Sequence, residues 1–546
     1  MSDGNMGTGD GGHPASCDDI PGAAEWPRTE NPASFQPMRV PYLESPPATI
    51  PVGAGRQLFV DDFLIERHSL VRTYHRPVKH PANPVFFPKT AHECNAQLPP
   101  ATLPKCGGLW YDERDQRFKM WYMASYLGAM AYATSENGIH WDRPALDVVP
   151  GTNLILPPNL LHPDSGTVWL DRDTSDPSTR FKMLLREPNP PGKGCFPGWL
   201  MTSPDGIHWS NPVPTGPMED RSTLFYNPFR RRWVQSIRRW IEPRGRCRCY
   251  WDAEDFFESG RWEAGQPPYW VGADCMDEAG DAPPQLYNLD AVAYESLMLG
   301  LFQIHKGPPN HIGEATGMPK LTELVLATTR DGFHWHRPDR RPFIGARREP
   351  GSWEYGYIES TGGLCLIVGD ELWFYYSAYA GDPKRISGDW RTSGTYCNGA
   401  VGLAKLRRDG FVSMQARYPG ASLTTRSLVF SGDRLFVNAN TAGAELTVEC
   451  LDEGNQTIPP FERQHCRGFR GNSTCAEIGW EGADSFAVLR GRRVKLRFQL
   501  DRGDLYAFWI TDSPRGASHG YLAAGGPGLS GSRDDNGAGS IRGGTR

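Results

Sequence analysis

The chain has 546 residues, of which 39% are hydrophobic and 22% are charged, and its formal net charge is −5. This balance is typical of folded globular proteins and excludes a mainly disordered chain. No basic block is large enough to indicate a nucleic acid or an anionic membrane surface as a partner. No apolar run reaches the length of about 18 residues that a membrane-spanning helix needs.

Residues 1–54 are rich in Gly, Pro, Ser and Asp, and we predict that they form a flexible extension or a segment that wraps around the folded part. Because residues 1–21 contain no apolar stretch typical of a signal peptide, we expect a cytoplasmic protein whose 12 cysteines are free thiols. The close pair Cys247 and Cys249 lacks the second pair or the histidines of a zinc site. We therefore predict no metal and no cofactor.

An internal repeat runs through the middle of the chain. The repeated motif occurs at 133–141, 201–209 and 327–335. It consists of a strand ending in Ser or Thr, a polar pair ending in Gly, an apolar residue, His and Trp. The first two copies are 68 residues apart and the third follows after 126 residues, about twice that step, so a degenerate copy is expected at 255–262. A fifth copy lies at 403–411. Each predicts a tight turn, because Gly accepts a positive φ.

Each copy follows a second strand–turn–strand pattern, and two hairpins per unit make the four antiparallel strands of one propeller blade. We predict an all-β fold with a five-bladed β-propeller at 55–419, a β-sandwich at 420–512, where alternating strands continue, and a flexible Gly-rich tail at 513–546. A single irregular β-sandwich is the alternative, but it does not explain a repeat of this length.

Carboxylates near the start of each unit are the candidate catalytic residues, because the innermost strands line the funnel in which propellers bind ligands. They are Glu93 before the first blade, Asp220 before the third, Asp290 in the fourth and Glu359 before the fifth. Two or three carboxylates facing one cavity can cleave a glycosidic bond, one as proton donor and one as nucleophile or base. A turn cap or an ion pair is the alternative role for each.

Glu359 is the preferred general acid, because burial beside Tyr355 and Tyr357 would favour its protonated form. Asp290 or Asp220 would then be the nucleophile or base. Four further residues are predicted to bind a carbohydrate substrate: His92, Arg221, Asn288 and Asp62. The repeat histidines lie on outer hairpins and are interpreted as packing residues.

Several segments resemble the five-bladed propeller glycoside hydrolases of families 32, 43, 68 and 130, and in particular bacterial family-32-like proteins. The resemblance covers about 56–512 and rests on 58–66, Arg76-Pro77 with 83–85, 117–122, the Ser203–Trp209 turn, 403–411 and 435–438. It implies a propeller followed by a β-sandwich and an enzyme acting on a glycoside, in related families a fructoside, arabinoside, xyloside or mannoside.

The family 32 motifs themselves are not preserved. Asp220-Arg221 inverts the Arg-Asp order, and Glu93-Cys94 lies before the first blade instead of in a middle one. Catalytic roles therefore do not transfer by motif. Asp61 and Asp62 are either the first-blade carboxylate or the cap of a strand that closes the ring. The alternatives to hydrolysis are a non-catalytic sugar-binding propeller and a lyase or transferase, and a sialidase-like hydrolase fits less well.

Overall fold

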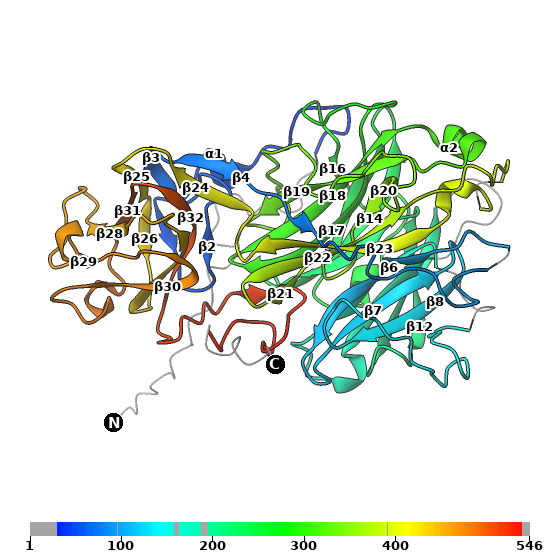
Figure 1. The fold of residues 1–546 in the computed structure, drawn as a ribbon, viewed down its shortest axis with the longest axis horizontal. Helices are drawn as coiled ribbons and strands as arrows, with labels where there is room; N and C mark the ends of the chain where they lie inside the picture. The colour runs from blue at the N-terminus through cyan, green and yellow to red at the C-terminus, as the bar shows by residue number, and fades with distance from the viewer. Residues whose placement is uncertain (1–29, 96, 158–162, 187–194, 390, 538–546) are drawn as a thin grey trace, which may run out of the picture.

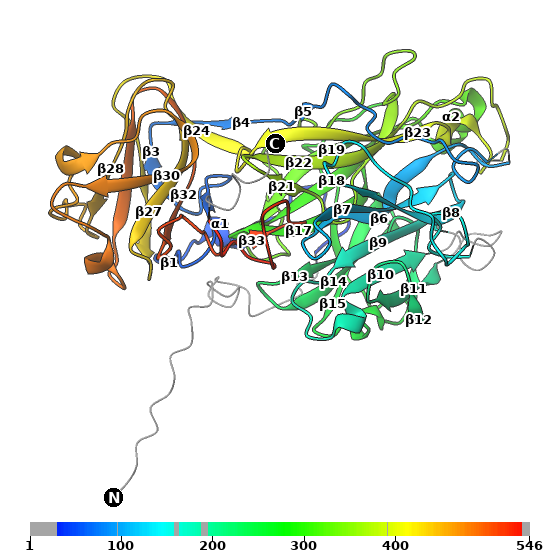
Figure 2. The same ribbon diagram turned by 60° about the horizontal axis from the view of Figure 1, so that its bottom comes forward.

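The computed structural model describes residues 30–95, 97–157, 163–186, 195–389 and 391–537. Strands make up nearly all of its regular structure, and the α-helices of these residues are the short α1 (Pro41–Glu44) and α2 (Asn310–Thr316). The predicted all-β character is confirmed. Figures 1 and 2 show a larger strand-rich unit on the right and a smaller one, which contains β27, β28 and β30, on the left. No helix of the described residues is long and apolar enough to cross a membrane.

The larger unit consists of antiparallel sheets that follow one another along the chain, here numbered I to V. Sheet I contains β6 (Thr102–Asp112), β7 (Arg117–Ala124) and β8 (Ala129–Ser135). Sheet II contains β9 (Ser165–Leu170), β10 (Phe181–Arg186), β11 (Phe196–Ser203) and β12 (Ser210–Met218). Sheet III contains β13 (Thr223–Asn227), β14 (Arg232–Ile241), β15 (Gly245–Ala253) and β16 (Tyr269–Gly272).

Sheets IV and V each recruit a strand from a distant part of the chain. Sheet IV contains β17 (Gln285–Glu295), β18 (Leu297–Gly307) and β19 (Leu321–Thr329), joined by β33 (Tyr521–Leu522). Sheet V contains β20 (Gly356–Glu359), β21 (Leu366–Val368), β22 (Glu371–Tyr379) and β23 (Gly399–Arg407), joined by β5 (Val78–Lys79). The two ends of the chain therefore help to close the larger unit.

Hydrogen bonds link each sheet to the next and the last to the first. Trp110 Nε1 donates to Val168 O at 2.9 Å between sheets I and II, and Leu224 N to Thr167 Oγ1 at 3.3 Å between III and II. Thr223 Oγ1 donates to Leu289 O at 2.7 Å, and Gln303 Nε2 to Ile358 O at 3.0 Å. Leu109 N of sheet I donates to Gly362 O, which lies between β20 and β21 of sheet V, at 3.0 Å, and this bond links the last sheet to the first.

Three of the repeated turns fold as the sequence predicts, with a positive φ at Gly138, Gly206 and Gly332, whereas Gly260 and Gly410 of the other two copies have no positive φ. The turns at Gly138 and Gly206 are also contacts between sheets. Gly206 has a φ of +81°, and its N–H donates to Ser203 Oγ at 2.8 Å. Its carbonyl accepts from Trp121 Nε1 of sheet I at 2.6 Å. In the same way Tyr375 of sheet V donates to Gly138 O at 2.6 Å. A local turn signal thus supports long-range packing.

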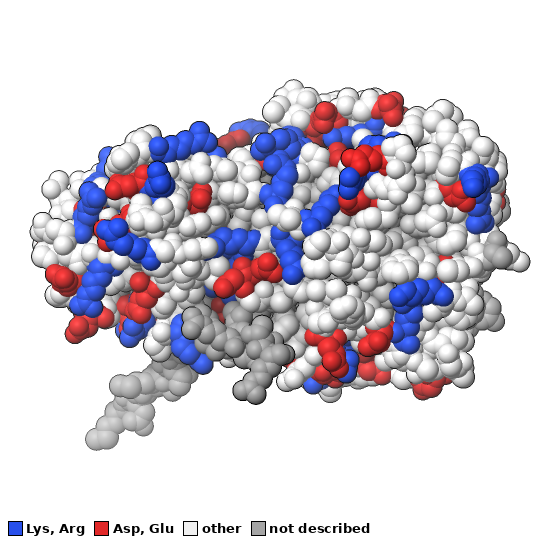
Figure 3. Space-filling view, in the orientation of Figure 1, with Lys and Arg blue, Asp and Glu red and all other residues white. Residues whose placement is uncertain are grey.

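The smaller unit has two sheets around one apolar core. One contains β24 (Val412–Ala416), β27 (Arg434–Asn440), β29 (Cys466–Arg467), β30 (Asn472–Trp480) and β32 (Gly503–Thr511), and the other contains β25 (Ala421–Thr425), β28 (Leu446–Leu451) and β31 (Lys495–Leu500). Phe59, Phe498 and Phe508 meet in this core at centroid distances of 5.4–6.2 Å. Basic and acidic side chains are interspersed over the face of both units that Figure 3 shows.

The structure differs from the predicted boundary at residue 54. Four N-terminal strands belong to the smaller unit, where they pair with β26 (Ser427–Val429), β32, β25 and β24: β1 (Thr49–Pro51), β2 (Gln57–Leu58), β3 (Ile65–His68) and β4 (Val71–Tyr74). Buried apolar side chains hold this segment, since Tyr42, Phe59 and Leu64 are fully buried. Residues 30–54 therefore pack, whereas 1–29 lie outside the described residues.

The predicted tail is also packed as far as it is described. Besides the pairing of β33 with β17, Ala517, Leu522 and Ala524 are buried between the sheets. The glycines of this segment allow close approach, as at Gly526, where an added Cβ would lie 1.6 Å from Ile367 O. The prediction of a flexible tail is wrong for 513–537, and 538–546 lie outside the described residues.

Candidate active site

Acidic side chains from four sheets lie at one place in the larger unit. Asp164 directly precedes β9, Asp220 lies three residues before β13, Asp290 is on β17, and Glu359 ends β20. Contacts across the sheets bring these positions together, because Arg221 N donates to Ser165 Oγ and Ser360 Oγ donates to Asp290 Oδ2. We call this set and its neighbours the acidic cluster.

Glu359 is fully buried and lies between two cations. Its Oε1 is 3.4 Å from Arg221 Nη2 and 3.5 Å from Lys105 Nζ, which reaches it from β6 of sheet I. Its Oε2 accepts a hydrogen bond of 3.2 Å from the Tyr379 hydroxyl. One carboxylate thus forms ion pairs with two cations.

Asp290 is buried among neutral hydrogen-bond donors. Asn288 Nδ2 donates to its Oδ2 at 2.9 Å, and the Ser360 hydroxyl donates to the same oxygen. Burial raises the pKa of the Asp290 carboxyl more than these bonds and the nearby Arg221 and Arg248 lower it. The structure therefore joins four of the predicted residues, Glu359, Asp290, Arg221 and Asn288, in one cluster.

Asp164 and Asp220 are neighbours with opposite surroundings. The Asp164 side chain is 9% exposed, and burial together with the charge of Asp220 raises its pKa to about 6, although Arg186 Nη1 lies 2.8 Å away. Burial would also raise the pKa of Asp220, but the attraction of Arg238, which contacts it directly, outweighs this and holds that pKa well below its usual range. The Asp220 side chain keeps 30% of its surface exposed, whereas Asp164 is buried.

Aromatic and basic side chains continue the cluster on the side of sheet IV. The Tyr287 hydroxyl accepts from Lys320 Nζ at 3.1 Å and lies 3.2 Å from the Tyr357 hydroxyl. Lys320 Nζ also makes cation–π contacts with the Tyr287 and Tyr357 rings, at 4.7 Å and 4.5 Å from their centroids. Burial alone would raise the pKa of Tyr287, but the surrounding cations, Lys320 foremost, lower it.

Three predicted residues lie elsewhere. Glu93 caps its own loop, where the backbone N–H groups of Lys89 and Thr90 donate to it, and it accepts from Tyr122 at 2.6 Å and Arg143 at 2.7 Å. Burial would raise the pKa of Glu93, but these bonds outweigh it and lower the pKa.

Asp62 lies in the smaller unit, with an exposed side chain paired with Arg72. The contact described for His92 is through its carbonyl, which accepts from Ser125 Oγ at 2.7 Å. Glu93, Asp62 and His92 thus lie outside the acidic cluster.

Sequence reasoning missed the cations and one acid. Lys105, Arg248 and Lys320 were not predicted, because nothing in their sequence position places them beside the carboxylates. Asp164 precedes strand β9 much as Asp220 precedes β13, and this parallel in position was the signal that could have identified it. The repeat histidines hold outer turns, as expected: His334 Nδ1 lies 2.7 Å from Asp331 Oδ2. No group of residues able to hold a metal ion is found within the described ranges.

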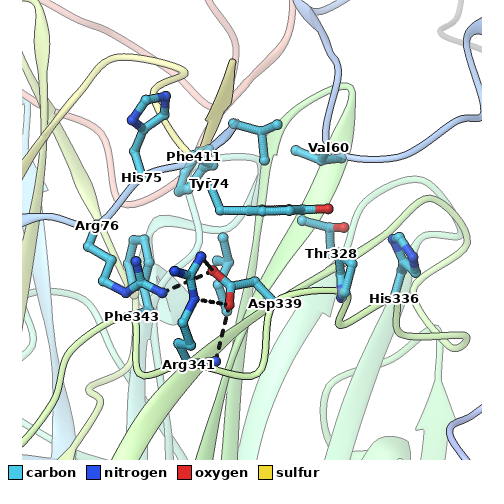
Figure 4. Close-up of a pocket in the computed structure, with 13 residues that line it drawn as sticks. Val60, Tyr74, His75, Arg76, Thr328, His336, Asp339, Arg341, Phe343 and Phe411 are labelled. Atoms are coloured by element: carbon cyan, nitrogen blue, oxygen red, sulfur yellow. Dashed lines mark hydrogen bonds and ion pairs between the residues drawn. The ribbon is translucent and has the colours of Figure 1, made fainter. Parts of the chain in front are cut away.

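A pocket between the two units does not compete with the cluster (Figure 4). Its polar side chains satisfy one another, since Asp339 accepts from Arg76 at 3.0 Å and from Arg341 at 2.8 Å. Its volume of about 30 Å³ holds a water molecule and not a sugar ring. It contains one carboxylate, Asp339, and so lacks an acid pair.

No protein-family model and no curated protein matches the chain. Solved structures do match. An N-acetylgalactosamine deacetylase from F. plautii is 14% identical, covers 67% of this chain and 97% of its own, and has a TM-score of 0.39. The family 43 protein BlXynB from Bacillus licheniformis is 10% identical, with coverages of 80% and 98% and a TM-score of 0.35.

A third structure, described with the family 130 mannoside phosphorylases and glycoside hydrolases that target β-1,2 mannosidic linkages in Candida mannan, is 12% identical, with coverages of 64% and 96% and a TM-score of 0.38. Families 43 and 130 belong to the group named from the sequence, whereas special closeness to family-32-like proteins stays a prediction. At such identities and TM-scores, the activity has to be inferred from the chain's own side chains.

Proposed function

We propose that the chain is a carbohydrate-active enzyme that cleaves a glycosidic bond at the acidic cluster. The observation that carries the proposal is the meeting of Asp164, Asp220, Asp290 and Glu359, which come from four different sheets. Cleavage of a glycosidic bond needs one carboxyl that holds a proton and one that is ionised, set apart by their environments. Asp164 and Asp220 fit these two requirements.

In this proposal Asp164 is the general acid and Asp220 is the base or nucleophile. The pKa of Asp164, raised to about 6, lets it carry a proton at mildly acidic pH and release it to the leaving oxygen. Asp220 is ionised over the same range because of Arg238. The role of general acid thus moves from Glu359 to Asp164, since two cations at 3.4–3.5 Å from Glu359 Oε1 are poorly suited to a proton donor.

The remaining residues of the cluster would position the sugar. Asp290 and Glu359 are acceptors for sugar hydroxyls, Arg221 and Asn288 are donors, and the Tyr287 ring offers an apolar face. Both carboxylates are buried, so they would contact the sugar only at the inner end of the site.

We also propose the frame that holds this site. Sheets I to V would be the blades of a five-bladed β-propeller, closed by β5 and β33, with the cluster in its central funnel. Support comes from the cyclic chain of hydrogen bonds between neighbouring sheets. The smaller unit would be a β-sandwich built from 49–74 and 412–511.

The test is hydrolysis of a panel of nitrophenyl glycosides and polysaccharides by the wild type, Asp164→Asn and Asp220→Asn. Both variants should lose about 10²–10⁴-fold in rate. Asp171→Asn is the matched control, because Asp171 lies at a hairpin turn of sheet II, the sheet that Asp164 precedes, and pairs with Lys182 at 2.6 Å. Full activity in either site variant would overturn the roles. Binding of sugars without cleavage of any would assign the chain to the sugar-binding propellers.

A further inference from the structure

Cations outnumber carboxylates on the inner side of the acidic cluster. Lys105 and Arg221 share Glu359. Arg246, Arg248 and Lys320 form no ion pair with a carboxylate of the described ranges, because no carboxylate oxygen lies within 4.0 Å of their nitrogens. The neighbouring acids are engaged, Asp220 and Glu219 by Arg238 and Asp164 by Arg186. The local excess of positive charge is notable because the whole chain has a net charge of −5.

Several buried polar atoms of the same region have no hydrogen-bond partner. They are Lys105 Nζ, Arg246 Nε and both ring nitrogens of His305. His305 is 2% exposed and stacks on Tyr287 with a centroid distance of 5.9 Å. Buried polar groups in folded proteins nearly always have partners, so this concentration of unsatisfied atoms indicates a ligand-binding place.

Burial acts on the pKa values of these groups. Burial lowers the pKa of Arg248 to about 9, against the attraction of Asp290, and also lowers the pKa of Lys320. His305 is neutral, because burial and the charges of Lys320 and Arg246 lower its pKa to about 2. A bound anion would raise the pKa values of Lys320 and Arg248 and offset the cost of burying their charges.

Two of the surplus cations have neighbours at the surface or are partly exposed themselves. Lys320 Nζ donates to Asn310 Oδ1 at 3.1 Å, and Asn310 begins the exposed helix α2. Arg246 is half-buried, donates to Gln285 Oε1 at 2.7 Å, and stacks over the Tyr287 ring at 4.9 Å. Lys320 and Arg246 therefore both lie over one aromatic ring, that of Tyr287.

We propose that the sugar taken up at this site carries a negative charge, held by Lys320 and Arg246 beside Tyr287. The inference rests on the proposed function and specifies its substrate class as an acidic saccharide. The oxyanion is assigned to the carboxylate of a hexuronate residue, because a guanidinium binds a planar carboxylate through two parallel hydrogen bonds. A sulfate ester on a sugar would present the same charge, and the test below separates the two.

The experiment compares matched acidic and neutral ligands. Galacturonan and glucuronan oligosaccharides are set beside the same oligosaccharides with their carboxyls reduced to alcohols, and a sulfated oligosaccharide beside its desulfated form. Reducing ends report cleavage and calorimetry reports binding, at low and at high salt. The variants are Lys320→Met and Arg246→Gln, and Lys384→Met is the control, because it removes one positive charge from an exposed side chain.

The wild type should bind the uronate forms at least about tenfold more tightly than the reduced forms, and less tightly at high salt. Lys320→Met and Arg246→Gln should each weaken binding of the uronate forms about thirtyfold, while Lys384→Met should not. Equal binding of acidic and reduced forms by the wild type would overturn the inference. A preference for the sulfated ligand over the uronates would overturn the carboxylate assignment.

Failure of the inference and failure of the proposed function give different results. Cleavage of neutral glycans that depends on Asp164 but not on Lys320 would keep the function and overturn the inference. Tight binding of uronates that depends on Lys320, with no cleavage of any ligand, would keep the charge selection and overturn the cleavage. Circular dichroism and the thermal unfolding of each variant show whether a lost signal reflects the site or the fold.

Discussion

Replacing Asp164 by Asn should change how the stability of the protein depends on pH. The ordinary pKa of this carboxyl is 3.8, and in the folded chain burial and Asp220 raise its pKa to about 6. The folded form thus holds the proton more tightly than the unfolded form. The carboxyl costs no stability below pH 4, destabilises the fold increasingly as the pH rises, and reaches its full effect above pH 6.

The size of the effect follows from the shift. Each pKa unit corresponds to about 1.4 kcal/mol, so the full loss of stability is about 3 kcal/mol. About 2 kcal/mol of this falls between pH 4 and pH 7, because the unfolded carboxyl is already half ionised at pH 4. The pKa of about 6 already includes the attraction of Arg186, whose Nη1 lies 2.8 Å away, so the loss of this ion pair in the variant is part of the same effect.

Urea unfolding of the wild type and Asp164→Asn, followed by tryptophan fluorescence at pH 4, 5, 6 and 7, measures this difference. The wild type should lose about 2 kcal/mol more than the variant between pH 4 and pH 7. Asp171→Asn, on the same sheet, should run parallel to the wild type. A constant gap between the wild type and Asp164→Asn would refute the raised pKa of Asp164 and, with it, its role as proton donor.

Three further predictions follow from the same geometry. The kcat/KM of the wild type should fall about tenfold per pH unit above about pH 6, as Asp164 loses its proton, and a rate that keeps rising to pH 8 would contradict this in a pH–rate profile. Arg408→Met should lower the free energy of unfolding by about 3–5 kcal/mol, because buried Asp534 loses its cation and buried Glu295 keeps only Arg56. Arg434→Met, which breaks an exposed pair, should cost about 1 kcal/mol or less in the same urea unfolding. Gly206→Ala should destabilise the fold by about 2–5 kcal/mol, because φ is +81° and a Cβ would lie 2.5 Å from the Trp121 ring. Gly151→Ala, where φ is +77° and the space around the Cβ is open, should cost only about 1–2 kcal/mol, and thermal unfolding of both variants measures the difference.

The sequence predicted the site only where local position was informative. Asp220, Asp290 and Glu359 were identified because they lie at or near the strands that begin their repeat units. Glu93 satisfied the same rule and was misplaced, because the backbone N–H groups of Lys89 and Thr90 and the side chain of Arg143 hold its carboxylate in a loop. Burial and hydrogen bonding decide such cases, and neither is visible in sequence spacing.

Other members of the cluster depend on contacts between distant parts of the chain. Lys105 meets Glu359 only because sheets I and V are adjacent, and Lys320, which precedes β19, meets Tyr287 of β17 only because both strands belong to sheet IV. The opposite pKa shifts of Asp164 and Asp220 likewise depend on tertiary contacts: burial and the charge of Asp220 raise the pKa of Asp164, whereas the attraction of Arg238 outweighs burial and lowers the pKa of Asp220. The balance of charge that defines the proposed substrate therefore required the three-dimensional structure.

The sequence by itself determined the strands, the repeated turns and the apolar residues that bury them, because a turn such as Ser203 to Gly206 is stabilised by its own atoms and by the conformational freedom of glycine. Tertiary structure alone decided which unit each strand joined. Ile50 lies beside Leu428 and Lys79 beside Ala404, pairings of residues more than 300 positions apart. A strand pattern shows that backbone groups need partners, but the choice of partner depends on burial summed over the whole core.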